Sequence, residues 1–272
     1  MTIAAGPDLL AAIVASVGRS VKSRETARPL GVLERTAHPA SPGAPAFRRA
    51  LADGVWPRVV AECKRRSPSR GVLRADYDPA AIAREYERAG AAALSVLTEP
   101  SFFDGSLEHL RAVRSVVRLP VLCKDFVVTP YQVFEAADAG ADAVLLIVAA
   151  LAPGQLRALH TLGESLGLAA LVEVHDEREL DVAMEAGASI LGVNSRNLRT
   201  LEVDLAVARR LASRLPAGAV RVAESGLRTP EDLTELSALG YDAFLVGERF
   251  MAAADPGAAL RELRAAGGRG ER

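Results

Sequence analysis

The stretch Ala139-Gly140-Ala141-Asp142-Ala143-Val144-Leu145-Leu146-Ile147-Val148 contains the structural unit that repeats along this chain. Its glycine ends a helix in the left-handed conformation that glycine adopts easily. An apolar run follows at once, as expected of a parallel strand buried on both faces. An Ala-Gly or Leu-Gly pair precedes an apolar run again at Gly90, Gly187 and Gly240, giving intervals of 50, 47 and 53 residues. This period predicts four copies of a double strand–helix unit.

Eight short apolar runs alternate with helical stretches from residue 59 onward. The runs cover residues 59–62, 93–97, 120–123, 142–148, 169–173, 189–193, 219–223 and 243–246. Four helices are predicted to begin at a proline that follows a capping residue: Asp78-Pro79, Thr129-Pro130, Thr229-Pro230 and Asp255-Pro256. Eight such units close most economically into a single (βα)8 TIM barrel of the α/β class. An open doubly wound sheet is the alternative, but its glycine-rich phosphate loop is absent from the sequence.

The segment before the barrel has a different pattern. Apolar residues from Leu9 to Val21 have helical spacing, and a connector follows that contains Pro29, Pro39, Pro42 and Pro45. We therefore expect an N-terminal helix and connector that cover the barrel at residues 1–54. The catalytic barrel is expected at residues 55–266, with a frayed tail at 267–272.

The composition and the first helix argue against several classes of protein. A net charge of −1 and 4% aromatic residues provide neither the basic surface nor the stacking side chains of a nucleic-acid-binding protein. The first helix carries Asp8 and lacks a basic start, so we expect no secretory signal, no membrane role and a cytoplasmic location. Cys63 and Cys123 each precede a lysine, and strand alternation should turn them outward as buried thiols.

Two scarce residue types gather at the ends of the predicted strands. The chain has only three lysines among its 33 basic residues, and Lys64 and Lys124 directly follow apolar runs. The only asparagines, Asn194 and Asn197, follow another run. Lysine can transfer a proton when its environment lowers its pKa, whereas arginine stays charged. The two strand-end lysines are therefore the first candidates for chemistry.

The active site of such a barrel lies where the carboxyl ends of the strands converge. Polar candidates at these ends are Glu62, Lys64, Lys124, Asp125, Glu173, Asn194, Arg196, Glu224, Ser225 and Gly247. Because buried charges need partners, the lysines and glutamates should form one hydrogen-bonded network. A purely structural salt-bridge cluster is the alternative, although stability alone would not require contributions from so many strands.

The loops after the last two strands suggest an anion site. Small residues in Ser225-Gly226 and at Gly247, before Glu248, would let backbone N–H groups approach a phosphate near a helix N-terminus. No histidine has the spacing of a metal site. His175 shares a face with Glu173 but lacks further ligands, so we interpret it as a loop or helix-cap residue.

Taken in order, the strand-end motifs resemble those of the indole-3-glycerol phosphate synthase family. The motifs are AECKRRSPSRG (residues 61–71), LTE (97–99), FFDG (102–105), LCKDF (122–126), LVEVH (171–175), VNSRNL (193–198), AESG (223–226) and VGE (246–248). The resemblance implies a carboxy-lyase of tryptophan biosynthesis. Such an enzyme converts 1-(2-carboxyphenylamino)-1-deoxyribulose 5-phosphate to indole-3-glycerol phosphate, carbon dioxide and water. No cofactor and no metal are implied.

The resemblance also suggests roles for particular residues. Lys124 would donate a proton to the ketone oxygen during ring closure, and Glu173 would serve as acid/base in the dehydration, with Glu62 and Lys64 beside it. Lys64 binding the substrate carboxylate remains an alternative. Asn194 and Glu224 would orient substrate hydroxyls and the amine.

The remaining matched positions lie around the anionic groups of the substrate. Arg196 would lie near the substrate carboxylate or form a structural pair. Ser225, Gly226, Gly247 and the Glu248 backbone would hold the phosphate, with Ser67 contacting it from a lid loop. Ser195 departs from the asparagine common in relatives. The Glu248 side chain should turn away from the phosphate.

Two other functions fit a phosphate-binding barrel. One is an isomerase such as phosphoribosylanthranilate isomerase, which would need a cysteine facing inward at the first strand end. The other is a sugar-phosphate-binding barrel without turnover, which would not need a titratable lysine–glutamate pair. The expected partner is a phosphorylated small molecule. The sequence identifies no docking protein, and a monomer is the simplest expectation.

Overall fold

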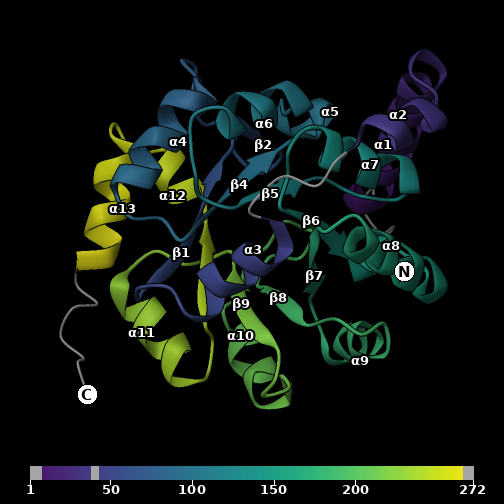
Figure 1. Ribbon diagram of the computed structural model, residues 1–272. Coiled ribbons are helices and arrows are strands. Elements are labelled where there is room, and N and C mark those ends of the chain that lie inside the picture. Colours follow the sequence, from purple (N-terminus) through teal and green to yellow (C-terminus); the bar gives the residue numbers. More distant parts are fainter. Residues whose placement is uncertain (1–7, 38–42, 266–272) are drawn as a thin grey trace, which may run out of the picture.

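The central feature of the computed structural model, which describes residues 8–37 and 43–265, is a closed barrel of parallel strands (Figure 1). The barrel strands are β1 (Arg58–Cys63), β4 (Ala93–Leu97), β5 (Val121–Lys124), β6 (Ala143–Ile147), β7 (Ala169–Val174), β8 (Ile190–Asn194), β9 (Val220–Glu224) and β10 (Ala243–Val246). Each pairs with its neighbours in sequence, and β1 closes the circle against β10. The predicted TIM barrel is confirmed, with every strand within one residue of its predicted bounds.

Side chains alternate between two buried layers along the strands, because successive strand residues point to opposite faces. Val60, Leu122 and Leu171 belong to the cluster inside the barrel. Cys63 and Cys123 belong to the outer cluster, which includes the apolar faces of the surrounding helices. The thiols therefore face outward as predicted. The inward set of positions continues to the carboxyl ends of the strands, where polar residues replace apolar ones on β1, β5, β7, β8 and β9.

Helices surround the barrel between its strands (Figure 1). They are α4 (Pro79–Arg88), α5 (Pro100–Phe103), α6 (Leu107–Arg114), α7 (Pro130–Asp138), α8 (Pro153–Ser165), α9 (Glu177–Glu185), α10 (Ala206–Leu211), α11 (Pro230–Ala238), α12 (Glu248–Met251) and α13 (Pro256–Ala265), with 3-10 turns at Val148–Ala150 and Ala212–Arg214. All four predicted proline starts are confirmed. The four repeat glycines have φ between 84° and 98°, as the helix-ending role requires.

The N-terminal extension contains more helix than the sequence pattern suggested. After α1 (Leu9–Ala27) come α2 (Leu30–Thr36) and α3 (Gly43–Ala52), where the sequence suggested only a connector. Pro29 precedes α2, and Pro45 lies in the first turn of α3, a position that tolerates proline. Pro39 and Pro42 lie outside the described residues, as does the predicted tail 267–272.

Helix α3 closes the amino-terminal end of the barrel. It contacts β1, β4, β6, β7 and β9, and its Phe47 and Leu51 are completely buried within the inner cluster. The buried Asp142 carboxylate accepts the Gly43 N–H at 2.6 Å and an Arg114 N–H at 3.0 Å, which ties the start of α3 to the barrel. The other end of the barrel is therefore left for ligand access.

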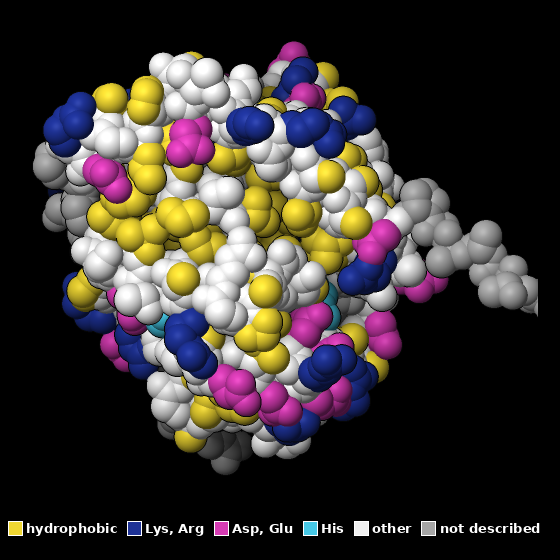
Figure 2. All heavy atoms as spheres, turned by 90° about the vertical axis from the view of Figure 1, so that its right-hand side faces the viewer, with side chains coloured by type: hydrophobic (Ala, Val, Ile, Leu, Met, Phe, Trp, Pro, Cys, Tyr) yellow, Lys and Arg dark blue, Asp and Glu magenta, His cyan; other side chains and the backbone are white. Residues whose placement is uncertain are grey.

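The surface carries charges of both signs. Figure 2 shows hydrophobic side chains gathered in a hollow on one face, with basic and acidic side chains interspersed around it. Among the described residues, no helix combines the length and apolar character needed to cross a membrane.

Replacing Phe47 with alanine tests the closing role of α3. Removing a fully buried phenylalanine should lower the free energy of unfolding by about 3–5 kcal/mol, because it leaves a cavity at the end of the barrel. Urea titration provides the measurement. Arg49→Ala on the exposed side of the same helix should change the stability by less than about 0.5 kcal/mol. Equal losses in the two variants would contradict this packing role.

Candidate active site

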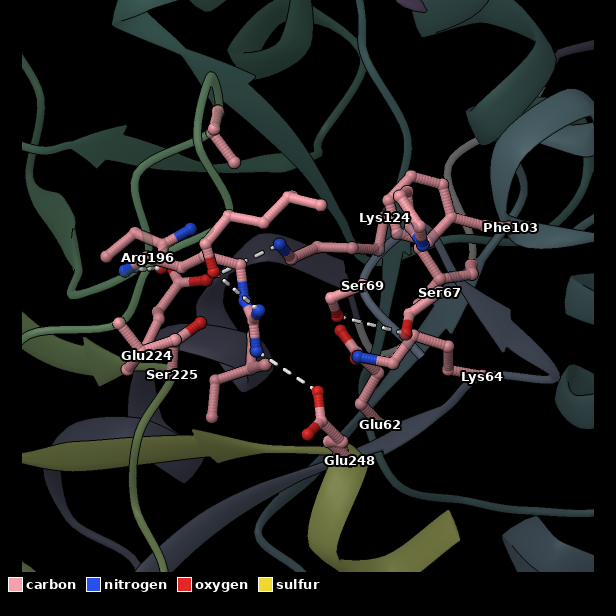
Figure 3. Close-up of a pocket in the computed structure, with 18 of the residues that line it drawn as sticks. Glu62, Lys64, Ser67, Ser69, Phe103, Lys124, Arg196, Glu224, Ser225 and Glu248 are labelled. Carbon is pink, nitrogen blue, oxygen red and sulfur yellow. Dashed lines mark hydrogen bonds and ion pairs between the residues drawn. The ribbon is translucent and has the colours of Figure 1, made fainter. Parts of the chain in front are cut away.

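A cavity of about 500 Å³ opens at the carboxyl end of the barrel (Figure 3). Every residue that the sequence singled out for catalysis or binding lines it: Glu62, Lys64, Ser67, Lys124, Asp125, Glu173, Asn194, Arg196, Glu224, Ser225, Gly226, Gly247 and Glu248. They come from β1, β5, β7, β8, β9 and β10 and the loops that follow these strands. Closure of the barrel therefore brings together residues up to 186 positions apart, from Glu62 to Glu248.

Lys124 lies at the centre of the charged network. Its Nζ is 3.3 Å from Glu173 Oε2 and 3.4 Å from Glu224 Oε2, and its side chain is only 14% exposed. Figure 3 shows it extending into the cavity toward Glu224. Burial opposes its charge, but the surrounding glutamates outweigh this effect and raise its pKa well above the usual value. Lys124 is therefore held as a cation, and it gives up its proton only to a strongly basic group.

A second ion pair lies at the end of β1. Glu62 and Lys64 are two residues apart and share the inward face, with Glu62 Oε1 2.6 Å from Lys64 Nζ. Ser95 Oγ lies 3.5 Å from the other carboxylate oxygen of Glu62. Burial raises the pKa of Glu62, but Lys64 and Lys124 outweigh burial and lower it. Glu62 is therefore a carboxylate that keeps Lys64 turned into the cavity.

The remaining two buried glutamates differ in protonation. Burial and the neighbouring carboxylates raise the pKa of Glu224 to about 8, against the opposing effect of Lys124. Glu173 is equally buried, yet Lys124 and His175 hold its pKa well below the usual range. At neutral pH one carboxyl is protonated and its neighbour is ionised. Such a divergence is typical of paired acid/base groups.

One oxygen of each of these glutamates has no hydrogen-bond partner among the described residues. They are Glu173 Oε1 and Glu224 Oε1. An unpaired buried carboxyl oxygen is costly.

Two glycines leave room for the carboxylates. A Cβ at Gly192 on β8 would collide with Glu224 Oε1 and lie 3.3 Å from its Cδ. A Cβ at Gly247 would lie 2.8 Å from Glu62 Cβ. Gly247 has φ of −133°, so its conformation alone does not require glycine. The space it leaves is for Glu62, so a larger residue there would disturb the catalytic end as well as any anion site.

The loop after β9 has the geometry of an anion site. Ser225 and Gly226 are both left-handed, with φ of 66° and 80°. Their N–H groups donate to no side chain or loop carbonyl within residues 8–37 and 43–265. Helix α11 begins shortly after them at Pro230. Successive N–H groups in such a turn form a concavity that favours anions.

The loop after β1 folds into a small hairpin over the cavity. Its strands β2 (Arg66–Ser67) and β3 (Gly71–Val72) pair antiparallel, and Ser67 is buried with its Oγ 3.3 Å from Ser69 Oγ. Arg70 and Arg196 both donate to Glu248, at 3.0 and 3.1 Å. The Glu248 side chain thus reaches across the mouth of the cavity, as Figure 3 shows for its contact with Arg196.

The comparisons with known proteins agree with this geometry. The family model described as indole-3-glycerol phosphate synthase matches residues 10–263. The chain belongs to this family. A protein named indole-3-glycerol phosphate synthase from Parafrankia sp. (strain EAN1pec) is 56% identical over 222 residues, covering 81% of this chain and 83% of that protein. Indole-3-glycerol phosphate synthase 2 from Streptomyces coelicolor is 49% identical and covers 94% of this chain and 98% of its own length.

Solved structures with low sequence identity share the fold. Thiamine phosphate pyrophosphorylase from Pyrococcus furiosus has a TM-score of 0.61 at 21% identity, covering 80% of this chain and 96% of that one. A 3-hexulose-6-phosphate synthase has a TM-score of 0.61 at 15% identity, covering 77% and 99%. These similarities support the barrel architecture alone.

Several residues that line the cavity were not singled out from the sequence. An apolar side of the cavity is formed by Leu9 and Ile13 of α1 together with Phe103, Phe126, Leu145 and Ile147. Leu145 and Ile147 could have been found from the inward alternation along β6. The α1 residues could not, because the helical pattern does not show where the helix packs. His175 does not line the cavity, but its Nε2 lies 3.4 Å from Glu173 Oε1.

No group of three or more histidine, cysteine, aspartate or glutamate side chains in the described parts of the chain has metal-binding geometry. The cavity charges instead satisfy one another. Three buried carboxyls face two ammonium groups, and the proton retained on Glu224 reduces the excess of negative charge.

The raised pKa of Glu224 should make stability depend on pH. Its pKa is about 8 in the folded protein and ordinarily 4.5, so the free energy of unfolding should fall as pH rises between these values. The slope should reach at most about 1.4 kcal/mol per pH unit. Glu224→Gln cannot lose a proton, so its stability relative to wild type should increase across this window. Urea titrations at several pH values provide the measurement.

The exposed Glu231 on α11 offers a matched control. Glu231→Gln should give a stability curve parallel to that of the wild type from pH 4.5 to 8. A parallel curve for Glu224→Gln would show that Glu224 does not retain its proton in the folded protein.

Proposed function

We propose that this cavity catalyses the decarboxylating ring closure of 1-(2-carboxyphenylamino)-1-deoxyribulose 5-phosphate. The products are indole-3-glycerol phosphate, carbon dioxide and water, in the biosynthesis of tryptophan. The family match along residues 10–263 supports this activity. The decisive structural support is the buried Lys124 ammonium held between Glu173 and Glu224, because the reaction needs a proton donor and an acid/base in one cavity.

Lys124 acts in the ring closure. As the aromatic carbon attacks the ketone carbon, the ketone oxygen develops negative charge and takes a proton from Lys124 Nζ. The glutamates around Lys124 keep it protonated before this step, and the developing alkoxide is basic enough to remove the proton. Loss of carbon dioxide then restores the aromatic ring.

Glu173 acts in the dehydration that follows. The new hydroxyl leaves as water while the ring system gives up a proton, so a group that can both accept and return a proton is required. Glu173 is ionised and can accept this proton. Glu224 carries a proton at neutral pH, and with Asn194 it orients the amine and hydroxyls of the substrate.

The two anionic groups of the substrate, its carboxylate and its phosphate, bind to different residues of the cavity. Lys64 and Arg196 bind the carboxylate before it is lost. The phosphate lies against the backbone of Ser225, Gly226, Gly247 and Glu248, with Ser67 closing over it from the β2–β3 hairpin. This proposal rests on the left-handed turn at Ser225 and on the hairpin that lines the mouth.

The competing isomerase function lacks the cysteine that it would need in the cavity. Cys63 belongs to the outer cluster, and burial raises its pKa far above the usual value. A thiol in this state is neither accessible nor ionised.

We propose that the protein is a cytoplasmic monomer and that its partner is a phosphorylated small molecule. We propose no nucleic-acid or membrane partner. The charges of both signs on the face in Figure 2 and the net charge of −1 support only the expectation that nucleic acids and membranes are not partners.

Lys124→Arg tests the acid role. Arginine preserves the positive charge and approximate length but cannot release a proton, so kcat should fall at least about a hundredfold while the substrate still binds. The assay follows indole fluorescence as the anilino-ribulose phosphate is consumed. Lys22→Arg on the exposed side of α1 should leave kcat unchanged. Retention of more than about a tenth of the wild-type kcat by Lys124→Arg would remove Lys124 from this role.

Glu173→Gln separates the two chemical steps. The amide keeps the shape of the carboxylate but exchanges no proton, so dehydration should slow more than ring closure. Rapid-quench analysis should then reveal a decarboxylated species that still carries its hydroxyl. Glu164→Gln, at an exposed position of α8, serves as the control. A loss confined to substrate affinity would make Glu173 a binding residue instead.

A further inference from the structure

Two buried atoms at the edge of the cavity face each other without any other partner. Glu173 Oε1 and His175 Nε2 are 3.4 Å apart, and neither atom makes a hydrogen bond among the described residues. His175 follows β7 directly, so its ring lies on the same face as the Glu173 carboxylate, two residues earlier. Its side chain is 15% exposed.

The other ring nitrogen of His175 determines its protonation. His175 Nδ1 lies 2.9 Å from Glu179 Oε2, and the same oxygen accepts the His175 backbone N–H at 2.8 Å. A carboxylate oxygen that accepts a backbone N–H also accepts from the ring, so Nδ1 carries a hydrogen. If Nε2 were bare, its lone pair would face the Glu173 carboxylate. Only an imidazolium, with a hydrogen on each nitrogen, satisfies both glutamates.

The charges around the ring agree with this assignment. Burial would lower the pKa of His175, but Glu173 and Glu179 outweigh burial and raise it to about 10. The Glu173 carboxylate in turn meets Lys124 from β5, Asn194 from β8 and Glu224 from β9. Its two oxygens therefore have cations on different sides, with Oε1 toward His175 and Oε2 toward Lys124.

Glu179 holds the ring in this orientation. It lies in the first turn of α9, where its own N–H donates to the capping carboxylate of Asp176 at 2.8 Å. Its side chain turns back to bind the ring and the backbone of His175 together. The ring is thus fixed between a helix start and a strand end, which limits its rotation.

We infer that His175, oriented by Glu179, is a positioning residue that keeps Glu173 ionised and aims its second oxygen at Lys124. This inference rests on the proposed role of Glu173 as acid/base. His175 does not touch the reacting atoms. It acts through Glu173, by stabilising the ionised carboxylate and fixing its rotation.

The protonation of His175 can be measured without any substrate. Nitrogen-15 NMR of the imidazole should show both nitrogens protonated at pH 8, with a transition near pH 10. Stability should respond in the same range: the contribution of His175 is complete below the unfolded pKa near 6.5 and is lost as pH rises through about 10. A transition near pH 6.5 in the folded protein would overturn the inference.

The effect on catalysis is tested by the pH profile of His175→Gln. Without the imidazolium the pKa of Glu173 should rise. The acid limb of the profile, where kcat/KM rises with pH, should therefore move to higher pH by about one unit or more. The kcat at neutral pH should fall about tenfold, and KM should change less than about threefold, because substrate contacts remain. Glu179→Gln should shift the limb in the same direction by a smaller amount.

His160 provides a matched control. It is a buried histidine on α8 whose Nδ1 lies 3.6 Å from Glu164, outside the cavity. His160→Gln should leave the acid limb in its wild-type position, even if stability falls. A His175→Gln profile that also keeps the wild-type limb, with only a general loss of activity, would show that His175 is merely structural.

Glu173→Gln, measured in parallel, separates the two proposals. If Glu173→Gln has lost turnover and His175→Gln keeps the wild-type limb, the positioning role is wrong and the proposed function stands. If Glu173→Gln keeps turnover, both are wrong, because His175 then has no catalytic carboxylate to position. Loss of turnover in Glu173→Gln together with a shifted limb in His175→Gln supports both.

Discussion

The alternation of side chains along the strands of a closed parallel barrel is the constraint on which the rest of this structure depends. Each strand contributes one set of residues to the interior and another to the helix-covered outside. Near the amino end the inward positions are apolar and form a core closed by α3. At the carboxyl end the same positions hold Glu62, Lys124, Glu173 and Glu224. The active site is therefore the polar continuation of the barrel core.

Burying several charged groups at the carboxyl end of the barrel costs free energy. A buried carboxylate is costly without a partner, and the mouth contains more carboxylates than ammonium groups. The structure meets this cost by pairing Glu62 with Lys64, by sharing Lys124 between two glutamates and by leaving a proton on Glu224. The same arrangement sets different protonation states on neighbouring glutamates, which proton transfer in two successive steps requires.

Other elements line the cavity around the charged network. Helix α1 brings apolar side chains to one side of the cavity, where an aromatic ring could pack. Across the opening, Arg70 of the β2–β3 hairpin and Arg196 of the loop after β8 both pair with the Glu248 carboxylate. Binding of an anionic substrate would compete with Glu248 for these arginines. The ion pairs across the opening are thus contacts that an anionic substrate would replace.

The sequence by itself determined the barrel, its strand bounds and the residues at the strand ends. These features follow from local signals: apolar runs, helix-ending glycines, proline starts and the parity that separates Cys63 from Lys64. Only the tertiary structure decided which strand ends meet, as when Lys124 of β5 reaches Glu224 of β9 across the barrel. It also decided the packing of α1 and α3, the direction of Glu248 and the link from His175 to Glu179. Packing direction, side-chain rotation and protonation depend on neighbours distant in sequence, which no local pattern encodes.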